Sequence, residues 1–373
     1  MSIQASITKF LYKGILKRIL FRIDPEIIHD RMVKFGASLG KSKIMHHLVS
    51  FCFNYHNHNL TQTVNGITFK NPVGLSAGFD KNAELGDILP QVGFGFAEFG
   101  SITGRPCTGN PKPRLWRLKK SKGLVVYYGL KNDGCEKISE RLTGKKFEIP
   151  IGISLGKTND TQTVVLEEGI ADYIKAYKAF AEKGIGDYYT INISCPNTHG
   201  GEPFVDPERL DLLLRAFNTL EATKPIFLKM PPDLTKKEVN AILEMVKKHD
   251  IAGFICANLT KNKEKLKLAD ERIPELGGIS GKPTEELAND LIRHIYLKTE
   301  GQYTIIGCGG IFSATDAYKK IRAGATLLQL ITGMIYEGPQ LIGEINRGLV
   351  KLLKKDGFKN ISEAVGADYK NKI

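Results

Sequence analysis

The stretch 189–198 passes from an apolar strand into a cluster of polar side chains, and it reads Tyr-Thr-Ile-Asn-Ile-Ser-Cys-Pro-Asn-Thr. A buried strand that ends in amides and a thiol is how an α/β enzyme brings reactive groups to the carboxyl end of its sheet. Pro196 stops the strand and favours an extended turn, so Cys195 and Asn197 are expected to face a cleft. A structural cysteine at a polar strand exit is the alternative interpretation. The amides on either side of the thiol favour a catalytic site.

Other predicted strand ends carry groups that suit the same site. Lys81 follows the first apolar strand and Lys229 ends the fifth, and cations there suit an anionic substrate or the charge of a reduced flavin. The pair Gly309-Gly310 follows the seventh strand, and Thr332-Gly333 follows the eighth. Loops after the last two strands of a barrel commonly bind a phosphate. The strand ends together predict one mouth with a thiol, two cations and a phosphate cradle.

Apolar runs of strand length recur between residues 60 and 350 and are mostly separated by stretches with helical periodicity. Strands that alternate with helices favour a parallel sheet, and eight of them predict a (β/α)8 TIM barrel. An open doubly wound sheet is the alternative, but no G-x-G-x-x-G follows the first strand. The predicted strands are 72–77, 96–101, 149–155, 188–193, 225–230, 253–257, 303–307 and 326–331, and the main helices are 160–183, 207–223, 235–249, 285–298 and 314–323.

The amino-terminal piece has a different character. Residues 5–22 predict a helix with apolar residues on one side and only basic charges on the other, a pattern typical of a helix lying in a membrane interface. A surface helix packed on its own domain is the alternative. Its lysines and arginines interrupt any apolar run long enough to span a bilayer. Asp24, Pro25 and Glu26 begin a second helix over 24–39. We therefore expect a small helical membrane-associated domain over 1–58 and the barrel over 59–373.

The net charge and the spacing of cysteines and histidines limit which partners, compartments and metal sites are expected. The formal charge of +13 indicates a negatively charged partner, such as lipid headgroups, nucleic acid or an anionic substrate. The basic run 112–122 predicts a hairpin flank, and no nucleic-acid site is expected there. None of the six cysteines has C-x-x-C spacing, which favours a reducing compartment over a disulfide framework. The four histidines between 46 and 58 lack a recognisable ligand pattern, so no metal is expected.

The chain resembles the dihydroorotate dehydrogenases over nearly its whole length. The leading helices with Asp24-Pro25-Glu26 resemble the membrane-associated, quinone-dependent class (class 2), in which a two-helix domain admits the quinone. The matching motifs are long and collinear, at 71–81, 109–114, 192–198, 277–281 and 306–311.

This resemblance implies FMN-dependent oxidation of dihydroorotate to orotate, a step of pyrimidine biosynthesis, with a quinone as electron acceptor. Cys195 takes the position of the catalytic base, which removes a proton from C5 of the substrate while a hydride leaves C6. A peripheral location follows, on the cytoplasmic face of the cell membrane or, in a eukaryote, at the mitochondrial inner membrane. The residues expected at substrate are Lys81, Asn192, Asn197 and Asn258, and those expected at FMN are Ala77, Ser101, Ser154, Asn192, Lys229, Gly281, Gly309, Gly310, Thr332 and Gly333.

Three departures from the family pattern bear on this expectation. The quinone-dependent class normally carries Ser as base, whereas Cys is typical of the soluble class that lacks the amino-terminal helices. Val126 replaces an Asn that anchors the pyrimidine ring, and Ala257 and Leu259 replace Thr or Ser beside Asn258. Each lost hydrogen bond removes about 1 kcal/mol, or about 1–3 kcal/mol if a polar group of the ligand stays unpaired. A related FMN oxidoreductase acting on a different, less polar cyclic substrate is therefore the main alternative.

Two further alternatives stay open. A tRNA dihydrouridine synthase-like enzyme is also a basic FMN barrel with a catalytic cysteine, but no RNA-binding domain is expected after the barrel, and the positive charge is concentrated at the start of the chain. A non-enzymatic flavin-binding membrane protein is disfavoured because both Cys195 and Lys81 are present. The glycines of 198–203, just after the thiol, predict a mobile lid over the site, with a rigid turn as the alternative.

Overall fold

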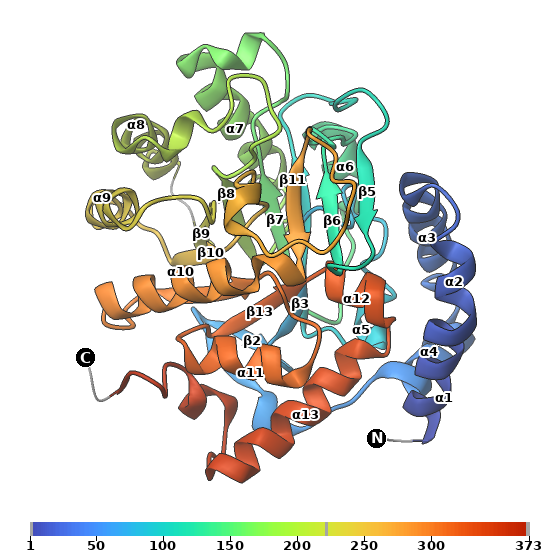
Figure 1. The fold of residues 1–373 in the computed structure, drawn as a ribbon. Helices are drawn as coiled ribbons and strands as arrows, with labels where there is room; N and C mark the ends of the chain where they lie inside the picture. The colour runs from blue at the N-terminus through green and yellow to red at the C-terminus, as the bar shows by residue number, and fades with distance from the viewer. Residues whose placement is uncertain (1–2, 221–222, 371–373) are drawn as a thin grey trace.

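The computed structural model describes residues 3–220 and 223–370, and its centre is a closed barrel of eight parallel strands (Figure 1). Each strand pairs with the strands that precede and follow it along the barrel, and the last closes on the first. All eight predicted strands are confirmed, with ends within two residues of those expected. They are β3 Val73–Leu75, β4 Phe96–Ile102, β7 Ile151–Leu155, β8 Tyr188–Asn192, β9 Ile226–Met230, β10 Gly253–Cys256, β12 Thr304–Cys308 and β13 Leu327–Leu330.

Helices follow the strands and surround the barrel, as the alternating pattern predicts (Figure 1). Their starts are fixed by local chemistry: the Asp206 side chain accepts a hydrogen bond from the amide of Arg209, and Thr235 forms a capping box with Glu238. The helix expected over 207–223 ends at Asn218, and positions 221–222 lie outside the described residues, as do 371–373 of the predicted barrel domain. The helices around the barrel are α5 Leu89–Val92, α6 Cys135–Leu142, α7 Leu166–Ala181, α8 Pro207–Asn218, α9 Lys236–Val246, α10 Glu285–Lys298, α11 Ala314–Arg322, α12 Thr332–Glu337 and α13 Leu341–Asp356.

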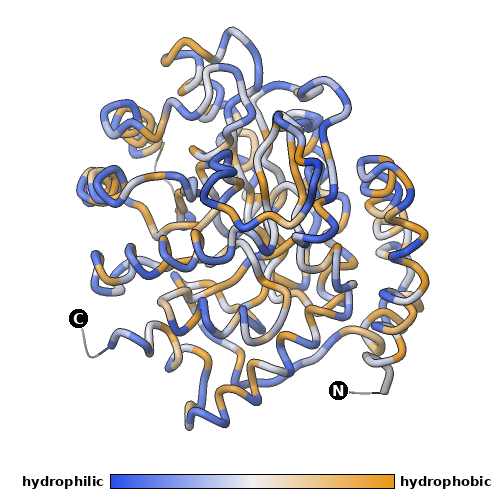
Figure 2. The backbone as a smooth tube through the Cα atoms, viewed as in Figure 1, coloured by the Kyte–Doolittle hydropathy of each residue, from blue (hydrophilic) through white to orange (hydrophobic). Residues whose placement is uncertain are grey.

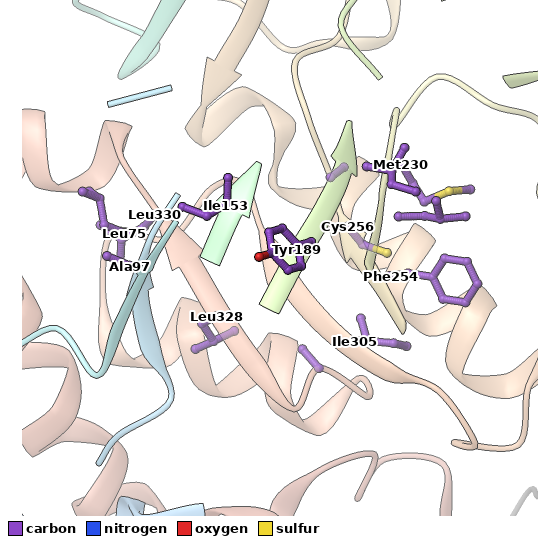
Figure 3. Close-up of a cluster of buried hydrophobic side chains, with 14 of the residues drawn as sticks. Leu75, Ala97, Ile153, Tyr189, Met230, Phe254, Cys256, Ile305, Leu328 and Leu330 are labelled. Atoms are coloured by element: carbon purple, nitrogen blue, oxygen red, sulfur yellow. The ribbon is translucent and has the colours of Figure 1, made fainter. Parts of the chain in front are cut away.

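Both faces of the barrel strands are buried, which explains why these strands read as continuous apolar runs. Outward-pointing side chains such as Tyr189, Phe254 and Leu328 pack under the helices (Figure 3). The next residue along a strand points inward, and Tyr188 belongs to the interior cluster with Phe96. Phe69 packs edge-on against Phe96 with ring centroids 5.3 Å apart. It belongs to the hairpin of β1 Gln62–Val64 and β2 Ile67–Phe69, so the amino-terminal end of the barrel is closed and the site must lie at the other end.

A small antiparallel sheet stands over that other end. The hairpin expected over 112–122 is present as β5 Leu115–Leu118 and β6 Gly123–Val126, which pair antiparallel. The strand β11 Gly278–Gly281 pairs with β6 on its other side. Leu124 and Val126 alternate with Val125, which packs against Ile279 on the opposite face of the sheet. One face of the sheet is therefore left to form a wall of the barrel mouth.

The amino-terminal helices pack along one flank of the barrel (Figure 1, blue). The first is continuous through α1 Ile3–Leu11, a π-helical segment Tyr12–Leu16, and α2 Lys17–Leu20. The second is α3 Pro25–Leu39, which begins at the predicted Asp24 cap. A third helix, α4 Lys43–Phe53, was not predicted; Ser42 caps it.

Two lysines of the first helix pair with acids on the barrel, whereas Arg18 of the same helix and Arg22 just after it are exposed. Lys9 Nζ lies 2.8 Å from Glu344 Oε2, and Lys13 Nζ lies 2.5 Å from Glu337 Oε2. The Tyr12 hydroxyl donates to the carbonyl oxygen of Ile335 at 2.7 Å. Acidic side chains on α12 and α13 thus form ion pairs with lysines of this helix, and the apolar side of the helix faces solvent.

Hydrophobic residues recur along all of these helices (Figure 2, orange), and many of their side chains are exposed. Twelve of the sixteen exposed large apolar side chains in the described residues lie in this part of the chain. None of the helices in residues 3–220 and 223–370 combines the length and apolar content needed to cross a bilayer. The twelve are Ile7, Phe10, Leu11, Ile15, Leu16, Ile19, Ile27, Met32, Phe35, Ile44, Leu48 and Phe51.

Candidate active site

The strand ends and the small sheet enclose one pocket of about 1260 Å³, counted with its open mouth. The thiol, the amides predicted to face substrate and both lysines line it, as do the predicted phosphate-binding glycines. Ser154 is the exception: it is fully buried behind Ser101, with the two hydroxyl oxygens 2.8 Å apart, and does not line the pocket. The predicted residues that line it are Ala77, Lys81, Ser101, Asn192, Cys195, Asn197, Lys229, Asn258, Gly281, Gly309, Gly310, Thr332 and Gly333.

A hydrogen-bonded chain orders the amides around Cys195. Asn192 Nδ2 donates to Ser101 Oγ at 2.7 Å, and Ser194 Oγ donates to Asn192 Oδ1 at 2.9 Å. Asn258 Nδ2 donates to the carbonyl oxygen of Ser194 at 2.8 Å. These contacts join the ends of β4, β8 and β10, so the positions of the amides depend on the barrel strands.

Asn197 offers an unused acceptor to the pocket. Its Nδ2 donates to the backbone carbonyl of Val126 at 2.9 Å, which ties the strand end to the small sheet. Its Oδ1 is buried and has no hydrogen-bond partner among the described residues. A buried acceptor without a partner is costly, so this oxygen suits an N–H group of a ligand.

The floor of the pocket carries a buried cation. Lys229 is 3% exposed, and its Nζ lies 3.3 Å from Ser76 Oγ and 4.0 Å from Glu98 Oε1. The Glu98 carboxylate is fully buried in the barrel and accepts a hydrogen bond from Gln329 at 2.9 Å. The Glu98 carboxylate thus lies beneath the lysine, and Lys229 presents its amino group to whatever occupies the pocket.

Lys81 joins the pocket to the amino-terminal domain. Its Nζ lies 2.9 Å from Nε2 of His29 on α3 and 4.1 Å from the ring centroid of Tyr128. Burial lowers the pKa of Lys81 to about 8, and burial followed by the charge of Lys81 holds the pKa of His29 well below its usual value. His29 is therefore neutral at physiological pH, and its Nε2 accepts the hydrogen bond from the lysine.

Gly310 and Gly333, in the segments predicted to bind a phosphate, allow their backbone to pack closely against neighbouring groups. At Gly310, with φ of +74°, an added Cβ would lie 2.4 Å from Cβ of Glu285. At Gly333, an added Cβ would lie 1.9 Å from the carbonyl oxygen of Ile311. Larger residues would force these loops apart, so the sequence needs glycine at both positions.

The Cys195 thiol is protonated at neutral pH in this protein. Burial raises its pKa to about 11; a backbone hydrogen bond from Asn197 and the charges of Lys261 and Lys157 act in the opposite direction. This value lies well above the ordinary thiol pKa of about 8.5. A base at this position needs help to lose its proton.

The aliphatic replacements lie where the sequence comparison placed them. Val126, Ala257 and Leu259 all line the pocket, so the wall around Asn197 and Asn258 is partly apolar. Sequence reasoning missed His29 and Tyr128, which also line it. Tyr128 has a buried hydroxyl without a hydrogen-bond partner in the described part of the chain. A histidine between the apolar positions of the 24–39 helix was the only available signal for His29.

No three His, Cys, Asp or Glu side chains are grouped as metal ligands in the described ranges. The segment predicted as a lid, 198–203, is anchored over the site. Lys157 Nζ donates to the carbonyl oxygen of His199 at 2.7 Å, and the His199 amide donates to Asn159 Oδ1 at 2.7 Å. That this segment opens stays a prediction.

The fold and the site together define a (β/α)8-barrel enzyme with its reactive groups at the carboxyl ends of the strands. A family model described as dihydroorotate dehydrogenase matches residues 59–353. The chain belongs to this family.

Known relatives match over almost their full length. The chain is 38% identical to a dihydroorotate dehydrogenase (quinone) of Nostoc punctiforme, over 97% of this chain and 99% of the relative. It is 39% identical to that of Crocosphaera subtropica, over 93% and 94% of the two chains. The crystal structure of ligand-free DHODH from Eimeria tenella superposes with a TM-score of 0.83 at 31% identity, covering 93% of this chain and 99% of that one.

Proposed function

We propose that this protein oxidises dihydroorotate to orotate and passes the electrons to a quinone, the activity that its relatives' names give. The observation that carries the proposal is the convergence of Cys195, three asparagines and two lysines on one pocket. These groups suit a small, planar, anionic ring that carries both hydrogen-bond donors and acceptors. The family match and the near-complete coverage of the quinone-named relatives support the same activity.

The residues present fit FMN. The buried ammonium of Lys229 and the hydroxyl and amide groups of Ser101 and Asn192 suit the polar edge of a flavin ring. Gly309-Gly310 and Thr332-Gly333 lie on neighbouring strand ends and suit its phosphate. When bound, FMN supplies the hydride acceptor and the path of electrons to the quinone.

The remaining steps belong to the side chains. Lys81 is the cation placed to pair with the carboxylate of the substrate, and Asn197 Oδ1 accepts a hydrogen bond from its ring. Asn192 and Asn258 fix the ring in the plane that their network defines. Cys195, as thiolate, removes the proton from the substrate carbon next to the one that loses hydride.

The quinone enters from the amino-terminal side in this proposal. His29 on α3 contributes directly to the pocket wall, so this helix separates the pocket from the flank of exposed apolar side chains. Burial of that apolar flank in a membrane would bring a lipid-soluble acceptor to the same side. We accordingly place the protein as a peripheral protein on the cytoplasmic face of the cell membrane, or on the mitochondrial inner membrane in a eukaryote.

Anaerobic mixing of the FMN-loaded protein with dihydroorotate tests the assignment. We expect the flavin absorbance to bleach and to return when a quinone is added. In Cys195→Ser, flavin content should be unchanged while the bleaching rate falls about 100-fold or more, because the hydroxyl is a far weaker acid than the thiol. If dithionite bleaches the flavin and quinone restores it, but dihydroorotate has no effect, the substrate assignment is wrong.

A further inference from the structure

A second, small cavity lies beside Cys195 and shares Leu130, Asn192 and Cys195 with the main pocket. It contains about 240 Å³ of space between atoms, with room for roughly one water molecule. Four of its polar lining residues are ionisable: Cys195 itself, Lys157 after β7, Tyr173 of α7, and Glu202 in the 198–203 segment. Thr198 completes its polar lining, apart from the strand end at Asn192. Cys195 and Glu202 thus line the same small cavity.

Glu202 is held at this cavity by the loop that carries it. The contacts of His199 with Lys157 and Asn159 fix one end of the loop, and Thr198 Oγ1 donates to the carbonyl oxygen of Gly201 at 2.9 Å. The Glu202 carboxyl group has no hydrogen-bond or ion-pair partner within the described residues. A half-buried carboxyl group without a partner is available to exchange a proton.

The charges around the pair favour one shared proton. Burial and then Asp233 raise the pKa of Glu202 to about 7, against the opposing charge of Lys261. At the thiol, burial is the main cause of the raised pKa and the Glu202 charge adds to it, while Lys261 and Lys157 oppose both. Tyr173 stays protonated because its burial raises its pKa. Two negative charges in this space repel each other, and one negative charge is stabilised by the two lysines.

We propose that Glu202 takes up the proton of the Cys195 thiol through a water molecule in this cavity, so that the thiolate forms as the carboxylate is neutralised. The S–H bond breaks, the water accepts that proton, and the water gives one of its own protons to the carboxylate oxygen. This exchange is a proton transfer, with no oxidation or reduction. After Cys195 has taken the substrate proton, the half-exposed Glu202 releases its proton to solvent, and one proton leaves per turnover.

This inference rests on the proposed role of Cys195 as base, and Glu202 acts only through that residue. The first test therefore needs no substrate. In the full-length, FMN-loaded protein, the rate of Cys195 alkylation by iodoacetamide is followed against pH by mass spectrometry of its peptide. Glu202→Gln removes the repelling charge, so we expect the pKa of Cys195 to fall by about 0.5 or more. Glu208→Gln, an exposed glutamate in the first turn of α8, should leave it unchanged.

The second test uses the reaction. In the wild type, the rate of flavin reduction by dihydroorotate should rise as pH increases through about 7, because only ionised Glu202 accepts a proton. Glu202→Gln should lose this rise and react at least about 10-fold more slowly at pH 8, while Glu202→Asp keeps the rise. A Glu202→Gln variant with wild-type alkylation and pH profiles overturns the inference. If dihydroorotate fails to reduce the flavin of the wild-type protein, the proposed function is wrong. The alkylation test then still shows whether Glu202 changes the pKa of Cys195.

Discussion

At the scale of single residues, the pocket combines a fixed polar network with an apolar wall. Asn192, Ser194 and Asn258 hold one another through hydrogen bonds and leave little freedom for reorientation. Asn197 is different, because its donor is used by the backbone of Val126 while its acceptor is unpaired. The Val126 side chain adds no polar group beside it. Ligand affinity should therefore be limited at this position.

Replacing Val126 by Asn should strengthen the binding of orotate. A new hydrogen bond to the ring is worth about 1 kcal/mol, which corresponds to a roughly 5-fold lower dissociation constant. Titration of the oxidised FMN-loaded protein with orotate, followed by the flavin spectrum, measures this constant. Val126→Leu keeps the wall apolar and serves as the control. Equal or weaker binding by Val126→Asn would mean that the ring does not approach this strand.

The sequence located most of the predicted site residues of the pocket because these stand at the ends of barrel strands. Cys195 and Lys229 could be placed in one mouth from strand order alone. The raised pKa of the thiol could not be predicted from the sequence, because it depends on burial by residues distant in the sequence. His29 was missed for the same reason: its contact with Lys81 exists only after α3 docks on the barrel.

At the scale of elements, the docking of α3 depends on a buried ion pair. Arg114 at the start of β5 and Glu26 in the first turn of α3 are 5% and 4% exposed, and Arg114 Nη2 lies 2.8 Å from Glu26 Oε1. Close packing supports the pair further along the helix, where a Cβ added to Gly36 would lie 2.7 Å from Leu85 Cδ2. The helix that carries His29 is thus held at both ends.

Glu26→Ala should lower the free energy of unfolding by about 3 kcal/mol, because it leaves a buried guanidinium without its partner. Burial alone would raise the pKa of Glu26, but Arg114 holds it below the usual 4.5. The difference from wild type should therefore be complete above pH 4.5 and shrink as the pH falls below it. Urea unfolding at several pH values measures this. Asp30→Ala, on the same helix but half-exposed and 3.8 Å from Lys131, should cost less than about 1 kcal/mol; an equal loss in both variants would contradict the argument.

The barrel strands were predictable because buried parallel strands are short, apolar and regularly spaced. The helix α4 was not predicted: apolar residues fill most of its short sequence, and a short apolar run does not by itself distinguish a helix from a strand. The small sheet was only half predicted: the hairpin of β5 and β6 is local, whereas the pairing of β6 with β11 joins segments about 150 residues apart. The predicted boundary between the domains at residue 58 stays a prediction.

At the scale of the whole molecule, exposed apolar surface is concentrated on one domain. Phe10, Ile44 and Phe51 are each about 70% exposed, and they belong to helices that contact one another. The acidic residues of α12 and α13 neutralise Lys9 and Lys13 on the inner side. Membrane attachment should therefore depend on apolar contact more than on the basic residues that the sequence emphasised.

The double variant Phe10→Ser, Phe51→Ser should bind vesicles at least about 10-fold more weakly than wild type, because each lost aromatic side chain removes well over 1 kcal/mol of burial. Co-sedimentation with vesicles of mixed neutral and anionic lipid measures the binding, and the flavin spectrum reports an intact barrel. Val164→Ser, Val165→Ser removes exposed apolar side chains from the barrel and should bind as wild type. Equal loss in the two double variants would place the attachment elsewhere.

The lysines that fasten the first helix to the barrel have a geometric consequence. Lys9 pairs with an acid on α13 and Lys13 pairs with an acid on α12. These two ion pairs hold the first helix, and with it the exposed apolar side chains, in one orientation relative to the pocket. A molecule resting on a flat lipid layer would then adopt a single tilt, with its entrance directed at the acyl chains. Neutron reflectometry on a supported layer should find one well-defined height for the barrel above the lipid.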